Sequence, residues 1–561
     1  MRLLIIHVFF IFSSVNYLYS QNDSIYNYHP PLEIPLILSA NFGELRPNHF
    51  HMGIDFKTNG VEGQKLLAIE NGYVSRIKVS PYGYGKVIYI THPNGITSVY
   101  AHCSVFLGKI DSIVRLNQEL TKNFEIELFP SSTEIILKRG ENFALSGNSG
   151  SSTAPHLHFE LRDTKTETAL NPLKYGFDII DNISPSISGL KIYSLTERGY
   201  RIKGKTKGIA VQKGKFGYYV GGNLVTIPSD FCTASGGIGL SFEVIDHYSQ
   251  ATNPIGIYGS YLIVNNDTLF SHKLDCVSFE HTRYINSHID YEENLLTKRK
   301  FQKSFKTKEN KLTIYSKEQS GIITIQPKDS LIIKYIAYDT KNNKSELKFN
   351  LKVLPGSINT PLNVKNEDYL FPDKSFTYKS EKGEILITEG CFYEPSLKNL
   401  KTSNNISIGH SSTIIQTPIQ IKLPLKDKKY GNEKYYIAVN NSYLATKYSN
   451  NWLSAESKSL GEYSIKIDTI APSITPLNFL KTDTILKKKI IQWKLSESKT
   501  NISDYDIFID GKWCLLEFES KGSYAFFRVT PDLIGKHTLK IIVKDVCGNE
   551  AIWEKEINFQ L

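Results

Sequence analysis

The sequence contains few cysteines, and none of them form a close pair. The six are Cys103, Cys232, Cys276, Cys391, Cys514 and Cys547. Their wide spacing excludes a CxxC site and a tight disulfide framework. Cys514 and Cys547 share the C-terminal part of the chain, so they are the pair we consider for a bridge in an exported protein. We expect Cys103 to pack as a small apolar side chain.

Long apolar segments and clusters of basic residues are also missing. Beyond the N-terminus, no segment approaches the roughly eighteen apolar residues of a membrane-spanning helix. The formal net charge of +10 is modest for 561 residues. It could reflect a generally lysine-rich surface or assist adhesion to an anionic wall or membrane. Since the basic residues do not cluster, we expect no nucleic-acid partner.

The N-terminus has the pattern of a secretory signal. Met1-Arg2 precede a short apolar run, residues 3–12, and then Ser13-Ser14. The run is too short to span a bilayer, and we expect cleavage near Ser20-Gln21, so that residues 1–20 are removed. No cysteine follows the run, which argues against a lipid anchor. We therefore expect a periplasmic or secreted protein of the cell envelope, with no transmembrane segment after cleavage.

The His-Glu-x-x-His pattern of many metalloproteases is absent, but histidines and a carboxylate recur at even spacings. His51 and Asp55 are four residues apart, and His156 and His158 are two apart. In a β-strand, such pairs face the same side. A helix would also align His51 with Asp55, but Gly53 and the flanking residues favour a strand.

These side chains suit a catalytic zinc ion, which takes three protein ligands and keeps a fourth position open. With His102 included, the fragments offer more ligands than such a site needs. Some of them must therefore stay off the metal, as general acid–base chemistry at a zinc hydrolase requires.

Residues from about 40 to 175, about a quarter of the chain, resemble the LytM/lysostaphin-type metallopeptidases, which cleave peptide bonds in peptidoglycan. The fragments that carry the resemblance are Arg46, His51-x-x-x-Asp55, Asn71-Gly72-Tyr73-Val74, Tyr84-Gly85, Tyr100-Ala101-His102, Ser146-Gly147-Asn148-Ser149-Gly150 and Pro155-His156-Leu157-His158-Phe159-Glu160. The resemblance implies that His51, Asp55 and His158 bind Zn²⁺. It also implies that His102 and His156 act in catalysis. Arg46 is expected to position a substrate carboxylate or to support the fold.

The fold class is predicted to be mainly β. Aromatic residues make up 12% of the chain, and short apolar runs at 66–69, 72–74, 86–90 and 97–100 are separated by glycine turns. We expect an antiparallel β peptidase domain over residues 36–177. The stretch 109–137 is longer than a minimal catalytic domain needs, and we expect it to form a loop or an extra hairpin.

Residues beyond the peptidase domain are predicted to form immunoglobulin-like β-sandwiches. We divide them into residues 183–355 (one domain or two), 356–467 and 468–561. The segments 240–246, 333–339 and 539–545 are alternating strands that each end in aspartate, as in cadherin-like domains. The C-terminal ends of this type could bind Ca²⁺, but their acidic residues look too sparse for a cage of six or more oxygens. The histidines of segment 281–291 are not spaced as ligands, so we expect a surface or interdomain patch there.

We therefore expect an exported zinc metalloendopeptidase that hydrolyses peptidoglycan peptides. One alternative is a non-catalytic LytM-like regulator that binds other wall hydrolases; such proteins typically lose zinc ligands, whereas this chain keeps all five site residues. A further alternative is an adhesion or scaffolding protein. Envelope protein partners are possible through the C-terminal β domains. Cleavage after D-Ala, in a glycine bridge or in a non-wall protein is chemically open to one zinc site.

Overall fold

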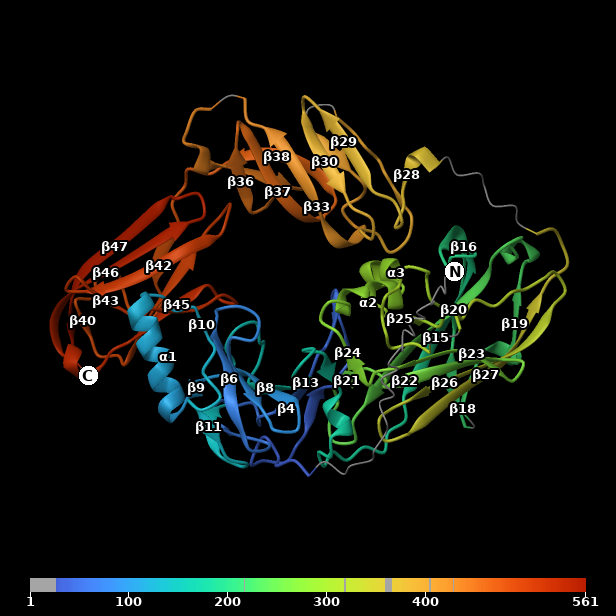
Figure 1. Ribbon diagram of the computed structural model, residues 1–561, viewed down its shortest axis with the longest axis horizontal. Helices are drawn as coiled ribbons and strands as arrows, with labels where there is room; N and C mark the ends of the chain where they lie inside the picture. The colour runs from blue at the N-terminus through green and yellow to red at the C-terminus, as the bar shows by residue number, and fades with distance from the viewer. Residues whose placement is uncertain are drawn as a thin grey trace, which may run out of the picture.

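The computed structural model describes residues 27–215, 217–316, 319–358, 366–402, 405–426 and 428–560. The expected signal peptide, residues 1–20, lies outside these ranges. The chain is mainly β. Its sheets form four regions that follow one another around a ring (Figure 1): the N-terminal region (27–177), the second region (183–358), the third region (366–467) and the C-terminal region (468–560). Within the described residues, no helix is both long and apolar enough to cross a membrane.

The N-terminal region is built on one antiparallel sheet with the strand order β1-β4-β13-β8-β7-β6-β10, beside a small sheet β5-β12-β9. The short apolar runs predicted as strands are confirmed at β5 to β8. The elements are β1 (Leu38–Ala40), β2 (Leu45–Arg46), β3 (His49–Phe50), β4 (Ile54–Lys57), β5 (Lys65–Leu67), β6 (Gly72–Val79), β7 (Lys86–Thr91), β8 (Ile96–Cys103), β9 (Val105–Phe106), α1 (Gly108–Thr121), β10 (Ile126–Leu128), β11 (Ile136–Leu137), β12 (Asn142–Leu145), β13 (His156–Asp163) and β14 (Ala169–Leu170).

The expectation of a loop or hairpin over residues 109–137 was wrong for the first half of the stretch, which is the helix α1. Ile110, Val114 and Gln118 recur every four residues and are its buried face, and Asp111 pairs with Arg115 on the exposed side. This i, i+4 spacing is the helical signal that the surrounding β pattern obscured. The second half adds β10 and β11 to the edge strand β6.

The second region is a two-sheet sandwich whose sheets meet at Phe242 and Tyr335, with ring centroids 3.7 Å apart. Its strand β24 pairs with β14, so the region also extends the N-terminal sheet. The elements are β15 (Ser186–Leu195), β16 (Arg201–Ala210), β17 (Gln212–Gly214), β18 (Gly217–Tyr219), β19 (Leu224–Ile227), β20 (Gly237–His247), β21 (Pro254–Ile255), β22 (Gly259–Val264), β23 (Asp267–Lys273), β24 (Cys276–Val277), α2 (Ile285–His288), α3 (Tyr291–Thr297), β25 (Phe301–Lys303), β26 (Ser330–Tyr338) and β27 (Lys344–Val353).

The third region has a hydrophobic core of its own, whereas the core residues of the other three regions join into one cluster. Its main sheets are β29-β30-β33-β37-β36 and β32-β38-β34-β35. The elements are β28 (Tyr369–Leu370), β29 (Phe376–Ser380), β30 (Gly383–Ile387), β31 (Ser396–Leu397), β32 (Ile406–Ile408), β33 (Ile414–Pro424), β34 (Tyr435–Val439), β35 (Ser442–Tyr443), β36 (Thr446–Ser449), β37 (Trp452–Ser459) and β38 (Gly461–Ile467).

The C-terminal region is a second sandwich, with Trp493 and Trp553 in ring contact between its two sheets. The elements are β39 (Ser473–Pro476), β40 (Ile485–Leu486), β41 (Ile490–Ser496), β42 (Ile502–Ile509), β43 (Lys512–Cys514), β44 (Glu517–Glu519), β45 (Tyr524–Arg528), β46 (Gly535–Asp545) and β47 (Glu550–Phe559). The bridge considered between Cys514 and Cys547 does not form, because both thiols are free. Cys547 instead packs against Tyr436 and Ala438 of the third region.

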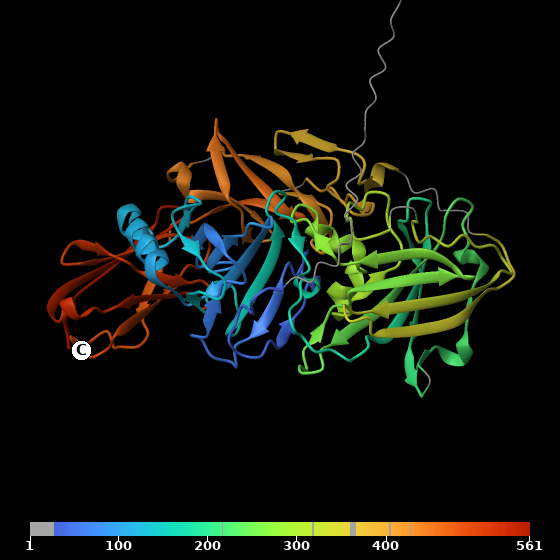
Figure 2. The ribbon, with the colours of Figure 1, turned by 60° about the horizontal axis from the view of Figure 1, so that its bottom comes forward.

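The ring closes where the C-terminal region returns to the N-terminal sheet, and both views place them side by side (Figures 1 and 2). Lys86 Nζ pairs with Glu517 Oε2 at 2.9 Å. The hydroxyl of Ser520 donates to the carbonyl of Pro81, and the ammonium of Lys521 donates to the carbonyl of Asn148. The last part of the chain therefore rests on the loops at 81–86 and 146–152.

Candidate metal centre

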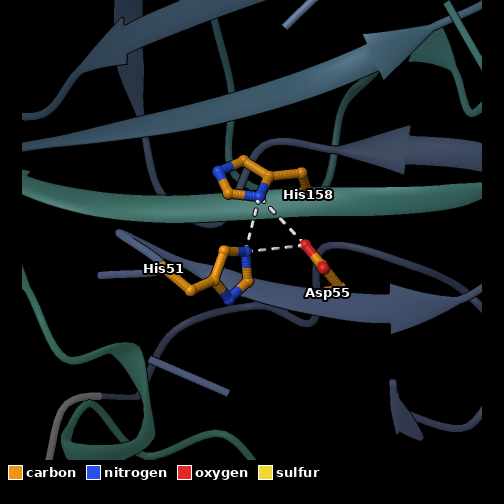
Figure 3. A group of neighbouring side chains, drawn as sticks. All are labelled: His51, Asp55 and His158. Atoms are coloured by element: carbon orange, nitrogen blue, oxygen red, sulfur yellow. Dashed lines mark hydrogen bonds and ion pairs between the residues drawn. The ribbon is translucent and has the colours of Figure 1, made fainter. Parts of the chain in front are cut away.

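Three polar side chains, two from neighbouring strands and one from the segment before β4, meet on one face of the N-terminal sheet (Figure 3). His158 on β13 lies directly opposite Asp55 on β4 in the antiparallel register, so the two side chains face the same side. His51 precedes β4. Its Nε2 is 3.0 Å from His158 Nδ1 and 3.1 Å from Asp55 Oδ1, and the last two atoms are 2.9 Å apart.

The close approach of these strands depends on Gly53. A Cβ atom at this position would lie 2.4 Å from the carbonyl oxygen of Phe159 and 2.8 Å from Cγ of Glu160. A larger residue would therefore push His51 and Asp55 away from β13. The apolar residues on either side of Asp55, Ile54 and Phe56, are fully buried on the core side.

The donor set fits a zinc ion. Tetrahedral bonds of about 2.0–2.2 Å separate neighbouring ligand atoms by roughly 3.3–3.6 Å, and the three atoms here lie only slightly closer. Two imidazole nitrogens and one carboxylate oxygen are also ligands that zinc accepts. The side chains are 8%, 11% and 7% exposed for His51, Asp55 and His158, so the group is held inside the protein yet reachable.

The ring of His51 is oriented by the main chain. Its Nδ1 donates a hydrogen bond to the carbonyl of Asn41 at 2.8 Å, which leaves the Nε2 lone pair for a metal. Asn41 is itself fixed by the second region: its Nδ2 donates to the carbonyl of Gly256, and its Oδ1 accepts from the Gly256 N–H.

The ring of His158 is oriented by Glu160, a fully buried carboxylate on the same face of β13. His158 Nε2 donates to Glu160 Oε1 at 2.8 Å, while Tyr84 and Arg162 also donate to this carboxylate. Burial raises the pKa of Glu160, but Arg162, His158 and Tyr84 outweigh it and lower the pKa to about 2. The carboxylate is thus a permanent anion that leaves His158 Nδ1 for a metal.

A proton competes with a metal ion for Nδ1 of His158. Burial lowers the pKa of His158, but its hydrogen bonds to Asp55 and Glu160 prevail and raise the pKa to about 9. His51, His156 and His158 hold the pKa of Asp55 well below its usual range although burial opposes them. A metal cation would displace the proton from His158 and keep the same electrostatic balance.

His102 reaches the site through an irregularity in β8. Its φ of 61° is left-handed, and the register between β7 and β8 contains an extra residue between Tyr100 and Cys103. Both of these neighbours lie in the core. The bulge therefore turns His102 to the opposite face, where its ring centroid is 4.8 Å from that of His156 and 5.9 Å from that of His158.

The second histidine pair remains off the three-atom group. His102 Nδ1 donates to the carbonyl of Ser149, and burial, followed by the neighbouring His158 and His156, lowers the pKa of His102 to about 3. His156 Nδ1 contacts the carbonyl of Ala154 at 2.8 Å, and its Nε2 lies 3.6 Å from Asp55 Oδ1. His156 thus presents Nε2 near the carboxylate, and the ring of His102 packs beside it.

Arg46 contacts the site from the hairpin β2–β3. Its Nη2 is 3.4 Å from Asp55 Oδ2, and its Nε is 3.1 Å from Glu44 Oε1. The same hairpin is held by the second region, since Thr282 accepts a hydrogen bond from the Phe50 N–H and the ring of His288 contacts that of Phe50. Segment 281–291 is therefore an interdomain patch, as its spacing suggested.

The structure brings together every predicted site residue: Arg46, His51, Asp55, His102, His156 and His158. The sequence interpretation gave no role to Asn41, Tyr84, Glu160 or Arg162, which orient the ligands. Strand parity could have found two of them, because Glu160 and Arg162 continue the even spacing of His156 and His158 along β13. Asn41 acts through its main chain and carries no such signal.

Comparisons with known proteins agree with this geometry. Residues 49–125 match Peptidase family M23, and residues 367–468 match the Zu5-like domain. A protein of Haemophilus influenzae described as an uncharacterized metalloprotease is 31% identical over 131 residues, which cover 23% of this chain and 21% of that protein. The DD-carboxypeptidase/endopeptidase Mpg of Neisseria meningitidis is 30% identical over 112 residues, 20% of each chain.

The chain thus spans about a fifth of the length of these curated relatives. Among solved structures, the catalytic domain of lysostaphin from Staphylococcus simulans is 24% identical. That alignment covers 25% of this chain and 91% of that chain, with a TM-score of 0.20.

Proposed function

The chain carries an M23-family peptidase domain near its N-terminus and a Zu5-like domain in its C-terminal half, and on this premise we propose that it is an exported zinc metalloendopeptidase of the cell envelope. Its substrates are stem peptides or cross-links of peptidoglycan, in which it hydrolyses peptide bonds. The observation that carries the proposal is the meeting of His51 Nε2, Asp55 Oδ1 and His158 Nδ1 within 3.1 Å of one another.

His51, Asp55 and His158 would hold the zinc ion. When bound, zinc supplies Lewis acidity, which polarises a carbonyl group and makes water more acidic. The chain contributes orientation: Asn41 and Glu160 fix which imidazole nitrogen faces the ion. Because these supports lie on strands and a buried turn, the ligands need little rearrangement when the ion binds.

His102 and His156 would manage the protons of hydrolysis. With its pKa lowered to about 3, His102 is neutral at neutral pH, and the Ser149 carbonyl holds its Nδ1–H. Its Nε2 is then free to accept a proton from water. His156, held in the same way at Nδ1, presents a second Nε2. Together they orient and deprotonate water and stabilise the oxyanion of the substrate.

Arg46 would serve the substrate as well as the fold. Its side chain is 36% exposed while it touches Asp55 and Glu44. One edge of the guanidinium can therefore keep these contacts while another binds a substrate carboxylate, which suits the bidentate geometry of arginine.

The competing function is a non-catalytic regulator that binds wall hydrolases. Two features favour catalysis over this alternative. All five histidine and aspartate positions are filled, and the buried carboxylate of Glu160 keeps His158 oriented. A domain that only binds partners has no need for a buried anion behind a metal ligand, given what such a group costs to desolvate.

The test is digestion of purified peptidoglycan by the mature full-length protein, followed by mass spectrometry of the released fragments. We expect fragments with newly hydrolysed peptide bonds from the zinc-loaded protein. We expect none after zinc removal and recovery of activity when zinc is restored. A zinc-loaded protein that binds peptidoglycan or a hydrolase but releases no fragment would contradict the proposal and favour the regulator.

A further inference from the structure

A second group of three metal-ligating side chains lies in the second region, well separated in sequence from the candidate zinc ligands. It consists of Asp181, Asp246 and Asp339, whose ligand oxygens all lie within 4.8 Å of one another. We call it the acidic group. Asp181 belongs to the link between the N-terminal and second regions, Asp246 lies near the end of β20, and Asp339 follows β26. The three residues are 6%, 1% and 5% exposed.

Two of the three carboxylates organise the surrounding turns. Asp339 Oδ1 accepts from the N–H groups of Lys341 and Asn343, and its Oδ2 accepts from Asn343 Nδ2. The same Asn343 Nδ2 also donates to the main-chain carbonyl of Asp181. The Oδ1 atom of Asp181 accepts from the Ile183 N–H. These contacts hold the link between the regions against the sandwich.

Asp246 is the most buried of the three and has the fewest donors. Its Oδ1 accepts from the N–H of His247, but among the described residues nothing donates to its Oδ2 or to Oδ2 of Asp181, and none of the three aspartates forms an ion pair with lysine or arginine. Burial, and then the neighbouring Asp339 and Asp181, raise the pKa of Asp246 to about 8. An almost fully buried carboxylate thus faces two others without a compensating cation, which is costly.

We propose that Asp181, Asp246 and Asp339 bind one Ca²⁺ ion, which ties the interdomain link to the second region. Every donor is an oxygen, which selects a hard cation over zinc. Three carboxylates from three separate segments suit Ca²⁺, which accepts irregular oxygen shells, better than Mg²⁺, which demands near-ideal octahedral geometry and usually keeps several waters. Water and bidentate carboxylates complete a shell of six or more oxygens.

The C-terminal region offers an internal comparison. Asp468, Glu497 and Asp545 form a similar trio at the link between the third and C-terminal regions, and Asn549 bonds Asp545 and the Asp468 carbonyl just as Asn343 does in the acidic group. There, however, both oxygens of Asp468 and of Asp545 accept hydrogen bonds, and Glu497 Oε1 accepts from the N–H groups of Ser498 and Lys499 while its Oε2 has no partner. Asp545, whose carboxylate is fully hydrogen-bonded, therefore supplies the matched control.

The experiment is calorimetric titration of Ca²⁺ into the zinc-loaded full-length protein, with Asp246→Asn and Asp545→Asn in parallel. We expect one Ca²⁺ with a dissociation constant of about 10⁻⁴–10⁻³ M, as in extracellular modules. Asp246→Asn should lose this binding, and Asp545→Asn should keep it. Failure of the protein to bind Ca²⁺, or equal binding by Asp246→Asn, would mean that the carboxyl groups only share a proton, and would overturn the proposal.

A second variant guards against misfolding of Asp246→Asn. Tyr248 lies among the same aspartates, which together with burial raise the pKa of its hydroxyl. With Tb³⁺ as a luminescent probe of the Ca²⁺ site, Tyr248→Phe should lose most of the tyrosine-sensitised emission and leave Ca²⁺ affinity within about twofold. Unchanged emission would place the ion elsewhere and contradict the assignment. Neither readout depends on peptidase activity.

Discussion

The histidine–aspartate group and the acidic group contain three ligating residues each, yet they differ in how those residues are supported. In the first, His51, Asp55 and His158 are backed by partners that orient each ring, including Asn41 and Glu160. In the second, Asp246 leaves one oxygen without a donor. Mixed nitrogen and oxygen donors with fixed orientation suit zinc, whereas buried carboxylates that keep oxygens without a donor suit Ca²⁺. The residues that hydrogen-bond to the ligands therefore indicate which ion is bound as much as the ligands themselves do.

The largest effect should come from removing a zinc ligand. His158→Ala deletes Nδ1 and leaves Glu160 and Asp55 without their shared partner, so zinc content should fall from about one per chain to near zero. Metal analysis after gel filtration measures this. His29→Ala, at an exposed histidine, is the control and should keep its zinc. Ca²⁺ binding should persist in both variants; loss of Ca²⁺ binding in His158→Ala would break the separation of the two groups.

Removal of a proton-transfer group should leave the metal in place. We expect His102→Ala to retain zinc and lose about 10²–10⁴-fold in kcat, because the neutral imidazole at the bulge accepts a proton rather than a metal. Steady-state kinetics on a soluble wall peptide, together with metal analysis, separates the two roles. Zinc loss in this variant would move His102 into the ligand set.

The acidic group should make stability depend on pH. The pKa of Asp246 rises to about 8 in the folded protein, against an ordinary value of 3.8. Between about pH 4 and 8 the unfolded chain has therefore released a proton that the folded chain keeps. Without Ca²⁺, stability should fall as pH rises through this window, by up to about 1.4 kcal/mol per pH unit.

Thermal unfolding at pH 5 and pH 8 in Ca²⁺-free buffer measures this slope. Asp246→Asn should flatten it, and so should millimolar Ca²⁺ with the unaltered protein, because either change removes the uncompensated charge. Identical slopes for the protein and for Asp246→Asn would show that the three carboxylates are not coupled through burial.

A smaller effect should come from the carboxylate behind His158. Glu160→Gln keeps the shape but removes the anion, so zinc affinity should fall by about 10–100-fold, the usual range for partners of metal ligands. Competition with a chelator of known affinity measures it. A gain in affinity would indicate that Glu160 chiefly balances the charge of Arg162.

The smallest effect should come from Asn41→Ala, which keeps the carbonyl that binds His51 but removes the link to Gly256. Zinc affinity should fall by less than about tenfold, below the range for a direct partner. The same chelator competition applies. An effect as large as that of Glu160→Gln would mean that the second region actively shapes the zinc group.

Much of the histidine–aspartate group followed from the sequence alone. Alternation in β4 and β13 places Asp55, His156 and His158 on one face, because neighbouring residues of a strand point to opposite sides. His51 was expected on the same strand as Asp55 but lies in the segment before β4, from which it reaches the same point. The same alternation predicted the antiparallel strands and the mainly β class. The helix α1 was missed because the four-residue spacing of Ile110, Val114 and Gln118 lies between segments with a β pattern. The bridge considered between Cys514 and Cys547 does not form, and spacing in the sequence does not reveal which thiols meet.

The remaining features depended on contacts between residues far apart in the chain. Only the bulge in β8 turns His102 toward the histidine–aspartate group, since strict alternation from Tyr100 would have pointed it to the core face. Asp181, Asp246 and Asp339 are spread from position 181 to position 339, and the sequence interpretation weighed Ca²⁺ only at the C-terminal aspartate ends. Folding of the link against β20 and β26 brings them within 4.8 Å. Alternation along a strand depends only on neighbouring residues, so the sequence determines it. The register of the strands and the packing of the regions depend on contacts throughout the core, so only the tertiary structure decides them.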